Sequence, residues 1–486
     1  MSSTCRTLVT ENRLFEILSQ IDAVVWGPAM IAFLLGTHMF LTFKTGFIQR
    51  KLGTAIRLSF KRESNEQGDV SPFGALSTAL AATIGTGSIV GVATAILAGG
   101  PGAVFWMWLA GIFGMATKYA EVFAAIKYRV KDHNGEMLGG AMYAWERGFT
   151  KQGKAPWYAK LGAIAFALFA AIAAIGTGSA VQASAMTGIL TSSGVNVEPW
   201  ILGLLIVVAV GAVIFGGVKI ITDICEKLVP VMAVGYALGC VVILAMNAPV
   251  LGEAIALIFS SAFTGQAAFG GAVGSGILAA LQFGCARGLF SNESGLGSAP
   301  IIASAARTPN PSEQALVAMT GTFWSTVVIC ALTGIVLVST MLAYPEIQAI
   351  ILDNPTVFSG AQLASLAFSE IPYFGTPLLV LGMVAFSYST ILGWSYYGSR
   401  CITYLLGKRA IKPYLVLYVA MAFLGAIGVG DMVWMVSDIG NALMAIPNII
   451  MVLALSGMIA RETKHYVYKN HLDQEDATPI PQLESK

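Results

Sequence analysis

The chain alternates long apolar stretches with short polar connections along most of its length. Read in a window of about 19 residues, its mean hydropathy predicts eleven apolar stretches that can cross a membrane as helices. They cover approximately residues 22–44, 73–99, 101–127, 160–190, 199–217, 224–246, 268–300, 314–342, 374–406, 412–430 and 432–459. An outer-membrane barrel would show shorter segments of alternating polarity. The pattern therefore predicts an all-α polytopic membrane protein.

The connections between these stretches differ in charge. Lysine and arginine are concentrated in alternate connections, among them 44–62 and 127–154, whereas connections such as 247–267 and 343–372 contain neither. Basic connections favour the cytoplasmic side of a membrane. The alternation predicts a multi-pass protein of the cell (inner) membrane, with its N-terminus outside and its C-terminus in the cytoplasm.

The ten stretches after the first divide into two groups of five. This predicts an N-terminal segment with an extra transmembrane helix and a basic cytoplasmic loop (1–72), a first repeat (73–246), a second, inverted repeat (266–459) and a cytoplasmic tail (460–486). Each repeat opens with a glycine-rich stretch, "IGTGSIVG" in the first and "AAFGGAVGSGIL" (267–278) in the second. Paired interrupted spans at corresponding positions are typical of transporters whose binding site lies at mid-membrane.

Composition narrows the possible functions. Charged residues make up 11% of the chain, against about 25% in soluble proteins, and the formal net charge is +2. No basic surface interleaved with aromatic residues indicates nucleic acid, and the six cysteines lack the spacing of a metal site. The four histidines do not cluster in the glycine-rich spans, as an intramembrane enzyme would require. We therefore expect neither an enzyme nor a bound organic cofactor.

The stretch 83–88 combines two glycines with three hydroxyl residues at the middle of a predicted span. Close helix packing explains a single pair of glycines in a membrane. If the helix is instead interrupted here, its freed N–H groups attract a carboxylate, and its freed carbonyls with nearby hydroxyls suit a small hard cation. A zwitterionic amino acid bound together with sodium fits both requirements.

Polar residues in two other spans are candidates for the same site. "FSYSTILGWSYYGS" places Ser387, Ser389 and Thr390 before Trp394, so that hydroxyls and an indole share one segment. Bonding of these hydroxyls to their own helix is an equally good explanation. Gln182 lies deep in another apolar span, where it contacts either the substrate or a neighbouring helix.

Four charged residues lie in or near predicted spans. Arg287 and Glu293 form either an inner gate or, as we favour, a structural ion pair at the cytoplasmic end of a broken span. Glu121 and Asp438 are functional candidates because ionisable groups inside membranes are costly. Neither has an obvious partner in the sequence. The extracellular segment 356–370 is predicted to form an amphipathic helix on the surface that acts as a gate element.

Four stretches resemble the alanine or glycine:cation symporter family, also called the sodium:alanine symporters. They are "GGPGAVFWMW", "ATIGTGSIVGVATAI", "ARGLFSNESGLGSAPI" and "STILGWSYYG", and the resemblance covers most of residues 30–460. It implies the leucine-transporter fold, with two inverted five-helix repeats, and sodium-coupled uptake of small neutral amino acids.

The resemblance also implies roles for particular residues. Ala81 and Ile84 would offer carbonyls to sodium, opposite the hydroxyls of Ser389 and Thr390. The implied substrate-binding residues are Thr86 and Gly87, facing the carboxylate, with Ser88, Gln182, Gly276 and Trp394.

The chain departs from the usual family pattern at four positions. Ser88 replaces an asparagine, Ser325 and Ser399 replace acidic residues, and Gln282 stands where a basic residue is frequent. Together these departures suggest a changed interior charge network, with altered substrate or coupling. Equal alanine uptake by the natural chain and by the triple variant Ser88→Asn, Ser325→Asp, Ser399→Glu would count against this hypothesis.

The leading functional prediction is sodium-driven import of a small neutral amino acid, most plausibly alanine or glycine, by alternating access across the lipid bilayer. The alternatives are a proton-coupled carrier or a carrier of a larger amino acid such as glutamine. A channel, a sensor or an intramembrane enzyme fits the sequence less well. The chain contains no Walker motif, so direct coupling to ATP is not expected.

Overall fold

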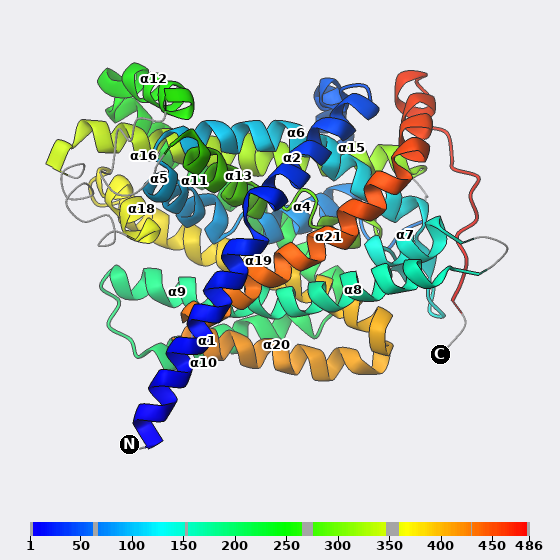
Figure 1. Cartoon of the computed structure of the whole chain (residues 1–486), viewed down its shortest axis with the longest axis horizontal. Coiled ribbons are helices and arrows are strands. Elements are labelled where there is room, and N and C mark those ends of the chain that lie inside the picture. The colour runs from blue at the N-terminus through cyan, green and yellow to red at the C-terminus, as the bar shows by residue number, and fades with distance from the viewer. Residues whose placement is uncertain are drawn as a thin grey trace.

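A computed structural model describes residues 3–61, 67–150, 154–264, 276–346, 359–428 and 430–483, and they form mainly helices (Figure 1). The α-helices are α1 (Ser3–Val25), α2 (Pro28–Lys44), α3 (Leu52–Ser59), α4 (Pro72–Thr83), α5 (Val92–Gly99), α6 (Gly102–Lys127), α7 (Ala141–Gly148), α8 (Trp157–Ala173), α9 (Val181–Ser192), α10 (Pro199–Ile214), α11 (Val218–Met246), α12 (Ala248–Thr264), α13 (Ile277–Asn292), α14 (Ala299–Ala303), α15 (Pro311–Thr322), α16 (Ala331–Ala343), α18 (Gly360–Ser369), α19 (Gly375–Leu406), α20 (Ile411–Ala426) and α21 (Gly430–Thr463).

Several shorter elements connect or continue these helices. Wider, π-helical turns are η2 (Gly87–Gly91), η3 (Ala174–Ala180), η4 (Phe323–Cys330) and η6 (Lys464–Tyr468), and tighter 3₁₀ turns are η1 (Ile48–Lys51) and η5 (Lys408–Ala410). Strands β1 (Val130–Lys131) and β2 (Met137–Leu138) pair antiparallel in a small hairpin. The all-α prediction is confirmed.

Helix boundaries follow local sequence signals. Proline occupies the first helical position of α4 and α15, where its missing N–H costs nothing. The preceding residues, Ser71 and Asn310, accept hydrogen bonds from the main-chain N–H groups of Gly74 and Glu313. At the other end, α5 is followed by Gly100 in the left-handed conformation (φ +74°), which ends the helix.

Eight helical stretches of the described residues are long and apolar enough to cross a membrane, and a bent pair makes a ninth. The bent pair is α4 with η2–α5, whose axes differ by 56°. Their outward faces are apolar, as in Val231 and Leu238 on α11, which are 72% and 61% exposed. A polytopic membrane protein is therefore confirmed.

The predicted number of eleven spans is not confirmed. The predicted span 199–217 corresponds to α10, which has 16 residues and is short for a span. The predicted span 268–300 begins within 265–275, outside the described residues, and continues as α13. The division into two repeats of five helices stays a prediction.

The described residues contain a second break, after α13. Most of the stretch 267–278 falls outside the described residues, and from residue 277 the chain forms the regular helix α13. The described break is at 293–298, between α13 and α14, where Glu293, Gly295 and Gly297 have φ of +54°, +93° and +80°. Three left-handed residues in this segment end one helix and redirect the chain into the next.

The packing places both breaks in the interior of the molecule. Helix α6 packs along α13 and α15, α19 packs on α4, and α21 packs along α8. Helix α1 packs against α21, and its N-terminal end projects from the rest of the molecule (Figure 1). The prediction of a helix within 356–370 is confirmed by α18. This helix does not simply lie on the surface, because it packs against η2 and α5 with Leu363 and Phe368 buried.

Candidate functional site

The first break lies at the predicted position. Helix α4 ends at Thr83, and Ile84 leaves the helical conformation with ψ of 85°. The next residue, Gly85, approaches two neighbouring helices closely: a Cβ there would lie 2.7 Å from Thr390 Oγ1 and 3.3 Å from Gln182 Oε1. The glycine is therefore required by lack of space, and the break is packed directly against α19 and α9.

Three of the predicted sodium ligands lie together at this break. Thr390 Oγ1 lies 2.8 Å and Ser389 Oγ 3.4 Å from the main-chain oxygen of Ala81, and all three residues are buried. Each hydroxyl also lies 2.9 Å from the main-chain oxygen of Phe386, so the expected bonding within the helix is present as well. Carbonyl and hydroxyl oxygens are the donors that hard cations prefer. The fourth predicted ligand, Ile84, follows Ala81 in the same turn.

A second group of polar side chains surrounds the π-helical turn η3. Gln182 Nε2 donates to the main-chain oxygen of Thr177 at 3.2 Å, and Asn441 Nδ2 donates to Thr177 Oγ1 at 2.8 Å. Gln182 Oε1, Asn441 Oδ1 and Thr86 Oγ1 are buried without a hydrogen-bond partner among the described residues. Because an unpaired buried polar atom is costly, these atoms mark a place where a polar ligand can bind.

Sequence reasoning missed Thr177 and Asn441. The signal for Thr177 was a second Gly-Thr-Gly triplet at 176–178, which repeats the triplet at 85–87. Both triplets coincide with π-helical turns: η2 starts at Gly87, the last residue of the first triplet, and η3 contains the second triplet. Such wide turns inside helices frequently occur at functional sites.

Trp394 lies beside this group and not at the first break. A Cβ on Gly178 would lie 2.7 Å from Trp394 Cγ, so the tryptophan packs against η3. Its indole Nε1 donates to Glu293 Oε1 at 3.1 Å. The tryptophan therefore connects η3 with the break between α13 and α14.

Three predicted substrate residues face other partners. A Cβ on Gly87 would lie 2.9 Å from Phe290 Cδ1, and Ser88 Oγ lies 2.8 Å from Ser291 Oγ. Both residues therefore contact α13. Gly276 precedes α13 next to the undescribed residues, is only half-buried, and has no atom within 4 Å of a Cβ placed on it. No hydrogen bond among the described residues joins Gly87, Ser88 or Gly276 to Gln182.

The charged residues pair differently from the prediction. Arg287 Nη1 lies 3.9 Å from Asp438 Oδ2, while the Glu293 side chain accepts hydrogen bonds from Trp394 and Ser298. The favoured ion pair between Arg287 and Glu293 is therefore wrong. Glu121 does have a partner three residues away, since Lys118 Nζ lies 3.2 Å from its Oε1.

Two of the departures from the family pattern make only local hydrogen bonds. Ser399 Oγ donates to the main-chain oxygen of Ser395 at 2.7 Å, one turn earlier in α19. Ser325 Oγ lies 3.5 Å from the main-chain oxygen of Thr322 and 3.4 Å from Thr326 Oγ1. The hypothesis of a changed interior charge network stays a prediction.

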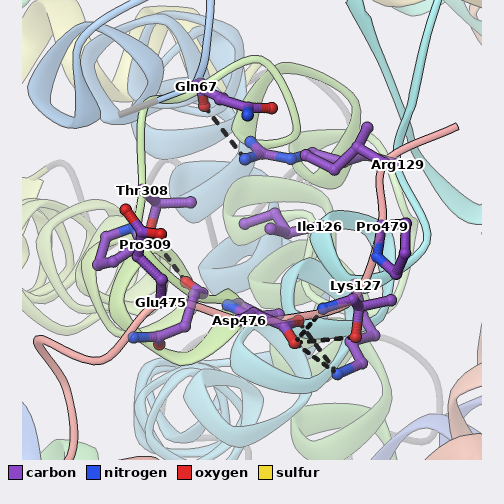
Figure 2. A pocket seen from close by; sticks show the side chains of 13 residues that line it. Gln67, Ile126, Lys127, Arg129, Thr308, Pro309, Glu475, Asp476 and Pro479 are labelled. Atoms are coloured by element: carbon purple, nitrogen blue, oxygen red, sulfur yellow. Dashed lines mark hydrogen bonds and ion pairs between the residues drawn. The ribbon is translucent and has the colours of Figure 1, made fainter. Parts of the chain in front are cut away.

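A cavity of about 290 Å³ lies elsewhere, beneath the C-terminal segment (Figure 2). Figure 2 shows Arg129, Lys127 and Asp476 of its lining already paired: Arg129 donates to the main-chain oxygen of Gln67 at 3.1 Å, and Lys127 Nζ lies 3.0 Å from Asp476 Oδ2. We interpret it as a space left under the C-terminal segment and not as the binding site.

The sequence and the fold of this chain are both similar to those of known membrane transporters. The profile of the "Sodium:alanine symporter family" matches residues 11–479. The chain is 46% identical to the sodium/alanine symporter AgcS of Methanococcus maripaludis over 93% of this chain and 97% of that protein. It is also 46% identical to an uncharacterized transporter of Haemophilus influenzae, over 95% and 98% of the two chains. The crystal structure of MhsT in complex with L-phenylalanine matches with a TM-score of 0.55 at 14% identity, covering 82% of this chain and 99% of that one.

Proposed function

The chain belongs to the sodium:alanine symporter family, a family of membrane transporters, and on this premise we propose that it imports alanine or glycine together with sodium by alternating access. The observation that carries the proposal is the first break, which places an interrupted turn of backbone between a cluster of oxygens and a group of unpaired polar side chains.

Sodium binds at the α4 side of the break. The main-chain oxygens of Ala81 and Ile84 and the hydroxyls of Ser389 and Thr390 are its ligands. The 2.8 Å separation between Ala81 O and Thr390 Oγ1 supports this assignment, because the ion needs these oxygens to converge. When sodium binds, the Thr390 proton turns away to the Phe386 carbonyl, which already lies within hydrogen-bond distance.

The amino acid binds on the other side of Gly85. Main-chain N–H groups of Thr86 and Gly87, at the start of η2–α5, attract its carboxylate. The unpaired oxygens of Gln182 and Asn441 accept hydrogen bonds from its ammonium group. Trp394 against Gly178 limits the space for a side chain, which favours alanine and glycine over glutamine.

The two sites share one turn of backbone, and this provides coupling. Sodium holds Ala81 and Ile84, and the next residues are those that meet the substrate. A cation that orders this turn lowers the cost of ordering it for the amino acid, and the reverse also holds. The transport cycle then needs both ligands before the two broken helices rearrange.

The orientation completes the proposal. The basic connections 44–62 and 127–154 and the tail lie in the cytoplasm, and the N-terminus lies outside. Reporter fusions at each end test this directly: cytoplasmic reporter activity at the N-terminus would contradict it.

Uptake by purified protein in proteoliposomes tests the function. We expect radiolabelled alanine to accumulate when an inward sodium gradient is imposed, and no accumulation when potassium replaces sodium. Accumulation driven by a proton gradient without sodium would favour the proton-coupled alternative. Stronger competition by glutamine than by glycine would favour the carrier of larger substrates, and failure to accumulate any neutral amino acid would reject the proposal.

A further inference from the structure

A buried cluster of charged side chains surrounds the break between α13 and α14. Lys118, Glu121 and Glu293 are each at most 3% exposed. Lys118 Nζ lies 3.2 Å from Glu121 Oε1 and donates to the main-chain oxygen of Glu293 at 2.9 Å. Two carboxylates and one ammonium thus lie together in a region where unpaired charge is costly.

Glu121 has an evident structural role. Its Oε2 accepts hydrogen bonds from the main-chain N–H groups of Gly295 and Gly297 at 3.1 and 3.2 Å, and from Asn448 Nδ2 at 2.9 Å. The two N–H groups belong to the break, where the helix cannot satisfy them. Since a membrane interior offers no water to replace such bonds, Glu121 stabilises the interrupted backbone.

The side chain of Glu293, by contrast, accepts no hydrogen bond from the main chain of the break among the described residues. Lys118 binds its main-chain oxygen, which any residue would provide. Its backbone is left-handed (φ +54°), a conformation that favours glycine and costs a larger residue free energy. The side chain of this glutamate meets Trp394 and Ser298, which points to a role for its carboxylate beyond the main chain of the break.

The carboxylate of Glu293 orients Trp394. Oε1 accepts the indole N–H at 3.1 Å, and Oε2 accepts the hydroxyl of Ser298, so each oxygen has its own donor. The tryptophan in turn packs on Gly178 of η3, one residue after Thr177. Thr177 is the residue that binds both Gln182 and Asn441.

We propose that Glu293 is a positioning residue for substrate recognition: by holding the indole of Trp394 against η3, it sets the pocket volume and links the break between α13 and α14 to the substrate. The inference rests on the proposed function for its substrate. It assigns to Glu293 a role distinct from that of its neighbour Glu121, which binds main-chain N–H groups of the break together with Lys118 and Asn448.

The test separates the hydrogen-bond acceptor from the charge. Glu293→Ala removes the acceptor, so the indole is free to turn, and we expect the KM for alanine to rise about tenfold while the maximal uptake rate changes less than about twofold. Glu293→Gln keeps an oxygen for the indole and should restore most of the lost affinity. Equal KM increases in both variants would overturn the proposal, because charge and not orientation would then matter.

A double-mutant cycle tests whether Glu293 acts through Trp394. Trp394→Phe removes the indole N–H and keeps an aromatic ring. In that background, Glu293→Ala should raise KM by no more than about twofold further, since the bond is already absent. The control is Trp106→Phe, which removes another indole bond, from Nε1 to the main-chain oxygen of Ala262 at 3.2 Å. Its effect should simply add to that of Glu293→Ala, and additivity for Trp394→Phe too would overturn the proposal.

The environment of the Trp394 indole can also be measured by spectroscopy, without knowing which amino acid is transported. In protein labelled with 5-fluorotryptophan, the ¹⁹F signal missing from Trp394→Phe identifies Trp394. That signal should move in Glu293→Ala and stay close to its original position in Glu293→Gln. A signal that does not move in Glu293→Ala would overturn the positioning role. Absence of sodium-driven uptake by the natural chain would instead contradict the proposed function alone.

Discussion

The hydroxyl of Thr390 is the residue-scale feature on which the proposed coupling depends. It belongs to α19, yet it lies 2.8 Å from a main-chain oxygen at the end of α4. A side chain that contacts a frayed helix end from another helix can hold that end open for a ligand. The same group is therefore expected to affect sodium dependence more than affinity for the amino acid in saturating sodium.

Substitution of Thr390 tests this role. Thr390→Val keeps the shape of the side chain and removes one ligand oxygen. We therefore expect the sodium concentration for half-maximal uptake to rise about tenfold, since the lost contact to the ion contributes about as much free energy as a hydrogen bond to a charged group. Thr390→Ser, which keeps the hydroxyl, should stay within about threefold of the natural chain. Ser395→Ala is the control, because Ser395 donates only to Leu392 of its own helix at 2.7 Å. A normal sodium dependence in Thr390→Val would remove Thr390 from the ion site.

Gly85 tests the close packing at the break. A methyl group there would lie 2.7 Å from Thr390 Oγ1, closer than atoms pack. Gly85→Ala should therefore reduce alanine uptake by about tenfold or more, because it separates the two sites. The matched control is Gly188→Ala in α9, where a methyl group meets no atom within 4 Å and alanine favours the helix. Equal uptake by the two variants would show that the break tolerates a side chain.

At the scale of elements, the two breaks differ in how far the sequence predicts them. The first break can be predicted from the local sequence, since glycines and hydroxyl residues cluster between 83 and 88. The second depends on Glu121, which satisfies N–H groups of Gly295 and Gly297 from a distant helix. Nothing near residue 295 in the sequence reveals that partner, so the break at 293–298 was not predicted, and most of the predicted interruption at 267–278 lies outside the described residues.

The site shows the same contrast. The approach of Ser389 and Thr390 to Ala81 was predicted through the family resemblance and is present in the structure. The grouping of Asn441 with Thr177 joins residues 264 positions apart and has no local signal. The pair of Lys118 and Glu121, by contrast, was visible as an i,i+3 spacing on one helix, and sequence reasoning overlooked it.

Helix α18 gives an element-scale prediction. At its first residue, Gly360, a Cβ would lie 2.6 Å from the main-chain oxygen of Val90 and 2.9 Å from Thr94 Cγ2, so α18 rests directly on η2–α5. Gly360→Val should prevent this contact and lower uptake per folded protein about tenfold, because α18 could no longer close on the broken helix. The measurement is uptake normalised to the monodisperse peak in size-exclusion chromatography. Unchanged uptake would mean that α18 does not need to close on the broken helix.

At the scale of the whole molecule, the C-terminal segment ties together distant parts of the chain. Lys127 Nζ of α6 lies 3.0 Å from Asp476 Oδ2. The main-chain N–H of Asp476 donates to the main-chain oxygen of Pro309, just before α15, at 2.9 Å. Further along, Pro481 accepts a hydrogen bond from Lys131 N at 2.9 Å. The segment therefore fastens α6, α15 and the small hairpin to one another (Figures 1 and 2).

Two aspartates of this segment give a matched comparison. The Lys127–Asp476 pair is largely buried, with side chains 12% and 16% exposed, whereas Asp473, which pairs with Lys61, is 94% exposed. Asp476→Asn should lower the free energy of unfolding by about 1–2 kcal/mol, and Asp473→Asn by less than about 0.5 kcal/mol, because exposed pairs are screened by water and salt. Thermal unfolding in detergent measures both. Equal destabilisation would contradict the ranking by burial.

The central claim is that sodium and the amino acid share one interrupted turn of helix, and alanine binding with and without sodium tests it most directly. Calorimetry on the purified chain should show alanine binding about tenfold or more tighter in saturating sodium than in potassium of equal ionic strength, and sodium binding tightened by the same factor when alanine is present. The difference should largely disappear in Thr390→Val. Equal alanine affinity in sodium and potassium would contradict the account.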